Sequence, residues 1–129
     1  MLNAEEWLEA YRQAWITRDP DAAAALFTED SRYREMPFQE PFAGPSGVRD
    51  YWARVTETQS DVEVHYGTPL SVGPRTAVEW WVNMKNGGED VTLAGEFMLT
   101  FAEDGRCRDL REYWHFEPRR VEPFAGWGA

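Results

Sequence analysis

The stretch Arg106-Cys-Arg-Asp-Leu-Arg-Glu-Tyr-Trp-His-Phe-Glu117 decides the fold. It follows a Gly-containing turn, and its side chains alternate in character from one residue to the next, which is the period of a β-strand. The odd-numbered positions combine Arg, Tyr and His, as the lining of a polar cavity does. The even-numbered positions offer Leu, Trp and Phe for packing, beside two Arg and one Glu. We therefore predict a strand that faces a cavity with its odd-numbered side.

Three further strands precede this one and are joined to it by Gly-containing turns. They are expected at residues 61–66, 76–85 and 91–101, so that the four strands form an antiparallel meander. Large apolar side chains occupy both faces of the long strands, whereas short helices can cover only one face. The other face would leave a large apolar patch in water. We therefore predict a homodimer formed through the outer face of the sheet.

The first half of the chain carries helix signals. Asn3 and Glu6 form a capping-box pattern, and apolar residues then recur at helical spacing. Asp19 and Pro20 are typical of a second helix start. A short strand is expected at 31–36 and a third helix from Val48, after a loop rich in Pro and Gly. Because the helices are segregated from an antiparallel sheet, the sequence predicts the α+β class.

The chain length of 129 residues is typical of one domain, predicted to span 1–129. The last segment, 118–129, is expected to be an irregular tail, because it contains two Pro and two Gly. It also carries Phe124 and Trp127. Aromatic side chains on a tail favour docking, either on this sheet or on a partner subunit.

Composition excludes several classes of function. The net charge of −10 argues against nucleic acid as a partner, since such binding needs a basic surface. No apolar run reaches the ~20 residues of a membrane span, and the N-terminus lacks a signal-peptide pattern, so we expect a cytoplasmic protein. Cys107 is the single cysteine, and the spacing of His65 and His115 does not indicate a shared metal site. No metal and no cofactor are predicted.

Three residues are candidates for acid–base chemistry. Glu79 lies between Val78 and Trp80, and Glu35 follows the charged Arg34 and precedes Met36 and Pro37. Burial of either acid in an apolar pocket would raise the pKa of its carboxyl group toward the range useful for proton transfer. His115 could face the cavity as an acid, a base or a hydrogen-bond donor. Each has a structural alternative: the two acids could form ion pairs with nearby arginines, and the histidine could be a satisfied structural residue.

Four aromatic residues are candidate walls of a binding pocket: Tyr11, Tyr33, Trp52 and Trp81. Aromatic side chains at helix and strand positions are equally consistent with a plain hydrophobic core. With acids among them, they are typical of a small-molecule site that is mostly apolar and holds a few polar groups. The expected ligand is a small apolar molecule.

The order of these motifs resembles the nuclear transport factor 2-like superfamily, in its SnoaL-like branch. The resemblance rests on the segments 15–22, 26–30, 47–52 and 111–115, and it extends to about Glu117. It implies a cone-shaped α+β barrel, in which N-terminal helices pack in the concave face of a curved mixed or antiparallel sheet. It also implies a pocket inside the cone and frequent dimerisation.

Two enzyme groups of this superfamily suggest roles for individual residues. By similarity to ketosteroid isomerases, Glu35 stands at the position of the catalytic base, and Tyr11 or Trp15 near that of the oxyanion-binding tyrosine. By similarity to limonene-type epoxide hydrolases, Tyr33 and Glu35 stand at the first catalytic pair, and His115 at the closing acid. Glu79 corresponds to the acid on the central strand.

Two hypotheses follow. In the first, the protein is an enzyme that transfers protons on a small apolar molecule, as an isomerase, cyclase or hydratase does. Glu35 is then the general base, and Glu79 or His115 the partner acid or hydrogen-bond donor. In the second, the protein is a non-catalytic binding protein or a dimeric accessory domain. The two differ in whether the three residues converge on one cavity.

Overall fold

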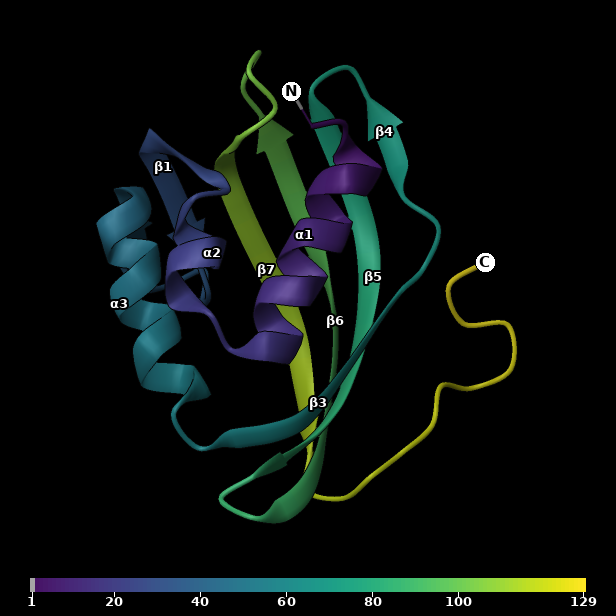
Figure 1. The fold of residues 1–129 in the computed structure, drawn as a ribbon. Coiled ribbons are helices and arrows are strands. Elements are labelled where there is room, and N and C mark those ends of the chain that lie inside the picture. Colours follow the sequence, from purple (N-terminus) through teal and green to yellow (C-terminus); the bar gives the residue numbers. More distant parts are fainter. Residues whose placement is uncertain (1) are drawn as a thin grey trace.

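The computed structural model describes residues 2–129 as three helices against one curved sheet (Figure 1). The helices are α1 (Ala4–Thr17), α2 (Pro20–Ala24) and α3 (Gly44–Thr56). The strands are β1 (Phe27–Arg34), β2 (Phe42–Ala43), β3 (Gln59–Tyr66), β4 (Leu70–Val72), β5 (Arg75–Asn86), β6 (Glu89–Phe101) and β7 (Cys107–Glu117). No helix among these residues is long and apolar enough to cross a membrane.

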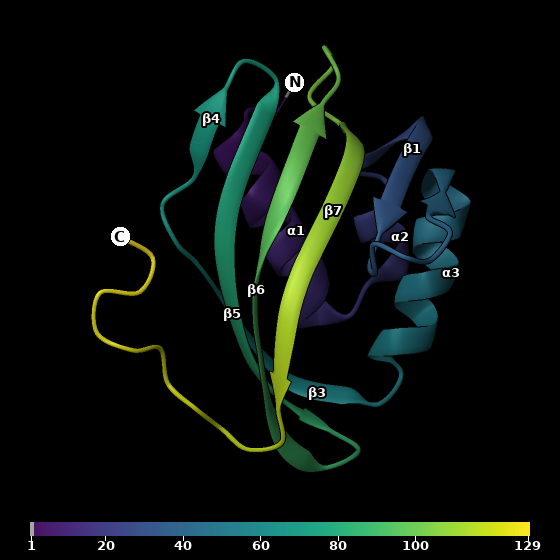
Figure 2. The same cartoon turned by 180° about the vertical axis from the view of Figure 1, so that it is seen from behind.

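The sheet has the strand order β2-β1-β7-β6-β5-β3, and β4 pairs with β5 beside this path. The predicted meander is present, since β3, β5, β6 and β7 pair antiparallel in succession. β1 joins β7 in parallel, so the sheet is mixed. Figures 1 and 2 show the helices on one face of the bent sheet. The predicted α+β class is confirmed, with a sheet that curves without closing.

Local sequence signals set the helix starts. Asn3 Oδ1 accepts from the backbone of Glu6 at 2.8 Å, and Glu6 Oε1 accepts from the backbone of Asn3 at 3.0 Å, so the capping box is formed. Asp19 caps α2, with Pro20 at its first position. α3 begins at Gly44, four residues before the predicted Val48, because the Pro at the next position is well suited to a first helical turn.

Aromatic side chains of α1 form the centre of the core. Trp7 and Tyr11 are almost fully buried and stack with ring centroids 5.0 Å apart. Tyr11 meets Trp52 of α3 edge-on at 5.2 Å and Phe97 of β6 at 5.5 Å. Such edge-to-face pairs stabilise beyond the area they bury. The core therefore ties α1 to both α3 and the middle of the sheet.

The even-numbered face of β7 packs beneath the helices as predicted, but the odd-numbered face does not line the cavity on that side. Leu110 and Glu112, at even positions, are buried beneath the helices, whereas Tyr113 and His115 are exposed on the outer face. Tyr113 and His115 line a separate hollow on that outer face. The helices cover only the concave face, so the side chains that pack and those that line the interior are on the same side of the strand.

The C-terminal segment, 118–129, contains no helix or strand and docks on the outer face of the sheet (Figure 2). The Trp81 indole donates to the carbonyl of Val121 at 2.9 Å, and the Trp81 and Trp127 rings lie 5.7 Å apart. Thr92 donates to the carbonyl of Arg119 and accepts from the backbone of Val121. Trp81 is thereby only 8% exposed. The C-terminal segment therefore covers part of the sheet face through which we predict the homodimer to form.

Candidate functional site

A cavity of about 370 Å³ lies between the concave face of the sheet and helices α1 and α3. We call it the inner cavity. Its walls are mostly aromatic, with a few polar groups, a composition typical of small-molecule sites. The lining residues are Tyr11, Trp15, Tyr33, Glu35, Tyr51, Trp52, Arg54, Val55, Thr56, Thr58, Gln59, Trp80, Met84, Asn86, Leu93, Glu112, Trp114 and Phe116.

Three buried polar side chains form a hydrogen-bonded chain at one end of this cavity. The Tyr33 hydroxyl donates to Oε1 of Glu112 at 2.6 Å. The hydroxyls of Tyr11 and Tyr33 lie 3.0 Å apart. Because the single proton of Tyr33 goes to Glu112, Tyr11 must be the donor to Tyr33. The chain thus runs from α1 through β1 to β7 and ends on one carboxyl oxygen.

Glu112 is held in a state unusual for a glutamate. Burial raises its pKa from the ordinary 4.5 to about 8, with the hydrogen bond from Tyr33 lowering this pKa and the nearby charge of Glu35 raising it. Burial also raises the pKa of both tyrosines well above 10. At neutral pH the two tyrosines are therefore donors, and Glu112 is mostly the neutral acid.

Glu35 supplies a second carboxyl group to the inner cavity. It follows β1 directly and is half-buried, and its Oε2 accepts from the Tyr51 hydroxyl of α3 at 2.8 Å. The pKa of Tyr51 is raised, first by burial and then by the charges of Glu112 and Glu35, so this tyrosine also remains a donor. The cavity thus brings together two carboxyl groups in different environments, a common basis for acid and base roles.

The other predicted site residues lie in a second hollow on the outer face, beneath the C-terminal segment. Glu79, Trp81 and His115 line this outer hollow of about 510 Å³, together with Glu35 and Glu112. Glu79 and His115 are both exposed. The prediction that Glu79 is a buried acid is wrong, because its apolar sequence neighbours point to the opposite face of β5.

The predicted residues are therefore divided between two hollows. Tyr11, Tyr33 and Trp52 line the inner cavity with Glu35, as the sequence suggested. Glu79, His115 and Trp81 do not line the inner cavity. Trp81 instead lies on the outer surface on which the C-terminal segment docks. The two hollows lie on opposite sides of the sheet, and they share Glu35, Glu112 and Trp114 in their linings.

Glu112 was absent from the sequence prediction, although a signal for it existed. It lies between Leu110 and Trp114 on the same strand face, so it is an acid flanked by apolar residues on that side of β7. Glu79 on β5 is flanked by apolar residues in the same way, but its side chain lies on the face that the helices leave uncovered. Knowing which face the helices cover distinguishes the two cases.

No group of three or more His, Cys, Asp or Glu residues within residues 2–129 is arranged to hold a metal ion.

Comparisons with known proteins agree with this geometry. Residues 8–110 match the family described as the SnoaL-like domain. No curated protein sequence matches the chain.

Three solved structures share the fold at low sequence identity. A hypothetical protein with a ketosteroid isomerase-like fold from Catenulispora acidiphila, in complex with trimethylamine, has a TM-score of 0.76 and 18% identity, over 86% of each chain. The epoxide hydrolase/cyclase-like enzyme SalBIII, described in pyran ring formation in the polyether salinomycin, has a TM-score of 0.75 and 20% identity, over 86% of this chain and 89% of its own. An epoxide hydrolase of the LEH-like type from M. tuberculosis has a TM-score of 0.70 and 20% identity, over 84% of this chain and 80% of its own.

Proposed function

The chain belongs to the SnoaL-like domain family, and on that premise we propose that it catalyses proton transfer on a small, largely apolar molecule bound in the inner cavity. The reaction is of the isomerase, cyclase or hydratase type. One observation carries this proposal: a buried, mostly neutral Glu112 shares a cavity with the carboxyl group of Glu35. An acid and a base in one apolar chamber are the requirement for concerted proton transfer.

The hydrogen bonds support a division of labour between the two carboxyl groups. Glu35 takes a proton from the substrate, and its orientation is fixed by the Tyr51 hydroxyl. Glu112 uses one oxygen to accept from Tyr33, so its own proton can be donated from the other oxygen to a substrate oxygen. When Glu112 becomes a carboxylate, the chain from Tyr11 and Tyr33 stabilises the negative charge.

In the ring closure of an epoxy alcohol, Glu35 removes one proton from the substrate and Glu112 returns one to it. Glu35 removes the hydroxyl proton as that oxygen forms a bond to an epoxide carbon. The epoxide carbon–oxygen bond breaks, and its oxygen takes the proton of Glu112. For isomerisation of an unsaturated ketone, Glu35 moves a proton from one carbon to another while Glu112 donates a hydrogen bond to the carbonyl oxygen. SalBIII, described as an epoxide hydrolase/cyclase-like enzyme with a role in pyran ring formation, is a precedent for ring formation on this fold.

The test uses two small probes, 4,5-epoxypentan-1-ol and 3-cyclohexenone, with product formation followed for each. Glu35→Gln is expected to lower turnover of the accepted probe by roughly 10²- to 10⁴-fold, the range of general base catalysis. Glu112→Gln should also lower turnover, because it removes the acidic proton. Glu79→Gln is the matched control, since Glu79 is exposed on the outer face.

The outcomes separate the candidates. Retained turnover in Glu35→Gln rejects Glu35 as the base, and an equal loss in Glu79→Gln rejects the inner cavity as the site. If thermal-shift measurements show that the probes bind but neither is converted, the protein is a non-catalytic binding protein of this family.

A further inference from the structure

The residues that line the inner cavity differ in exposure from one end to the other. Glu112, Tyr11 and Tyr33 are at most 7% exposed and form its closed end. Arg54 and Asn86 are exposed, and Gln59 is half-buried. These three residues come from the last turn of α3, the end of β5 and the start of β3. The cavity therefore opens between these elements, and we call the three residues the rim.

In each of the two rim amides, the side-chain oxygen already accepts a hydrogen bond from another residue of the protein. Gln59 Oε1 accepts from the Trp15 indole at 2.9 Å. Since an indole N–H can only donate, the oxygen assignment of this amide is fixed and its NH₂ group is left as a donor. Asn86 Oδ1 accepts from the Thr58 hydroxyl at 2.5 Å, which leaves the NH₂ group of Asn86 as a donor too.

Arg54 adds a positive charge to these donors. It is the one cationic residue among the described residues that line the inner cavity. Its guanidinium carbon lies 5.8 Å from the ring centroids of both Phe42 and Tyr51, so two aromatic faces hold it in place. Within residues 2–129 no carboxylate lies within 4.0 Å of this guanidinium, and it donates no side-chain hydrogen bond. Its donors are free for a ligand.

We propose that the substrate is an apolar carboxylic acid, bound as its anion, with the carboxylate held by Arg54 and the rim amides. A guanidinium recognises a carboxylate through paired, charge-assisted hydrogen bonds. The apolar body of the substrate then lies between the indoles of the cavity, and its reacting end reaches Glu112. Glu35 repels a carboxylate, so the reverse orientation is disfavoured. This inference rests on the proposed function only for the identity of the reacting end.

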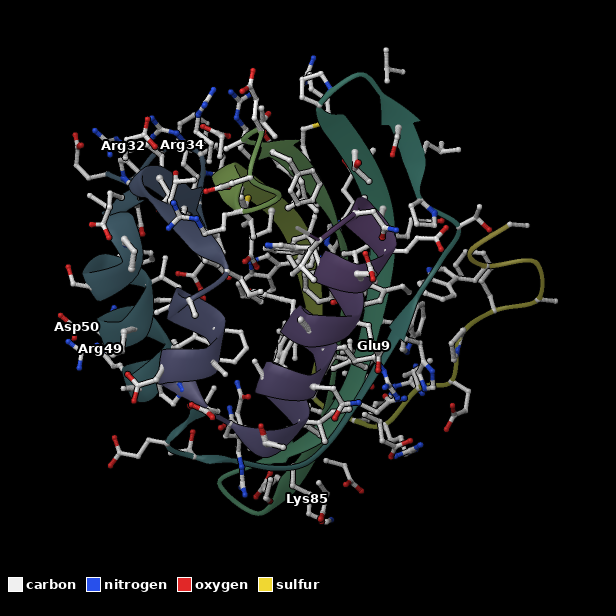
Figure 3. All side chains as sticks on the ribbon, turned by 45° about the horizontal axis from the view of Figure 1, so that its top comes forward. Glu9, Arg32, Arg34, Arg49, Asp50 and Lys85 are labelled. Carbon is white, nitrogen blue, oxygen red and sulfur yellow. The ribbon has the colours of Figure 1, made fainter. Side chains whose placement is uncertain are left out.

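The experiment compares two probes with the same carbon skeleton, 4-phenylbutyrate and the neutral 4-phenylbutanol. Dissociation constants are measured by isothermal titration at pH 7 for the unmodified protein, for Arg54→Gln and for Arg49→Gln. Arg49 is a matched control on α3: its side chain is 51% exposed, and it points away from the body of the protein (Figure 3). It does not line the inner cavity.

The unmodified protein is expected to bind the carboxylate roughly three- to tenfold more tightly than the alcohol, as a partly exposed charge-assisted pair allows. Arg54→Gln should abolish this preference and leave the affinity for the alcohol within about twofold. Arg49→Gln should change neither affinity. High salt should weaken binding of the carboxylate alone, since exposed ion pairs are screened.

Two other sets of results would overturn the inference, and they differ in what they imply for the proposed function. If the protein prefers the alcohol, or if Arg54→Gln keeps the preference for the carboxylate, the rim does not select carboxylates, and the proposed proton transfer still stands on neutral substrates. If neither probe binds, both the inference and the proposed use of the inner cavity are rejected.

Discussion

Glu112 makes the stability of the protein depend on pH in a predictable direction. Its pKa is about 8 in the folded chain and near 4.5 when exposed, so the folded state keeps a proton that the unfolded state releases. The free energy of unfolding therefore falls as the pH rises from about 4.5 to about 8, by at most ~1.4 kcal/mol per pH unit. Below about pH 4.5 Glu112 is protonated in both states and does not lower the free energy of unfolding. Above about pH 8 the loss of stability from Glu112 is complete.

Glu112→Gln removes the titrating group and keeps an oxygen that can accept from Tyr33. We expect its free energy of unfolding to fall less between pH 5 and pH 8 than that of the unmodified protein, as measured by urea denaturation. Glu79→Gln, on the exposed outer face, should keep the full dependence. Parallel curves for the unmodified protein and Glu112→Gln would show that Glu112 is already ionised at neutral pH.

Glu112 is also expected to set the upper end of the pH range in which the protein is active. If Glu112 acts as the acid, kcat should decline as the pH rises through about 8, where its proton is lost. In Glu112→Gln this decline should disappear from the pH–rate profile, leaving a low and flat residual rate. A decline that persists in the variant would assign that titration to another group.

The sequence predicted the position of one cavity carboxyl group correctly and that of another carboxyl group wrongly. Glu35 was identified through its position before a Pro-containing loop, and it does line the inner cavity. Glu79 and Glu112 look alike in sequence, since each has apolar residues at the two nearest positions on its own strand face. Only the tertiary fold decides which side of a strand is covered, and alternation alone leaves that choice open.

At the scale of elements, the docked C-terminal segment is expected to stabilise the sheet. Trp127 packs edge-on against Trp81 and is half-buried, whereas Phe124 is 65% exposed. Trp127→Ala should lower the free energy of unfolding by about 1–2 kcal/mol, the scale expected for partial burial of a large aromatic side chain. Phe124→Ala should cost less.

Hydrogen exchange gives a second measure of the same docking. The backbone N–H of Val121 donates to Thr92, so its protection should decrease in Trp127→Ala if the ring anchors this segment. Equal costs for Trp127→Ala and Phe124→Ala, with unchanged protection of Val121, would contradict the anchoring role.

Elements with local signals were the ones the sequence predicted well. The caps at Asn3 and Asp19 fix their helices by hydrogen bonds within three residues, so the pattern is readable along the chain. β1 was expected at 31–36 and spans Phe27–Arg34, because Phe27 joins the sheet by pairing with Cys107, 80 residues away. β4, three residues long, was not predicted. Its pairing depends on β5 and not on its own propensity.

At the scale of the whole molecule, the predicted homodimer remains a proposal about the outer face. The C-terminal segment covers Trp81, yet Tyr113 is still 46% exposed there and Phe124 65%. We expect light scattering at micromolar concentration to give about twice the chain mass of 15.0 kDa. Tyr113→Glu should shift the mass toward that of one chain by placing a charge on this face. A single-chain mass for the unmodified protein would remove the proposal.

The parallel pairing of β1 with β7 has a consequence for how the protein is made. β1 leaves the ribosome early, but one of its two edges must wait for the last strand, and the bond from Tyr33 to Glu112 spans 79 residues. Long-range pairings of this kind slow folding and leave strand edges open in the meantime. The nascent chain can therefore pair β3, β5 and β6 first, while the acidic end of its chamber takes shape only after synthesis has almost finished.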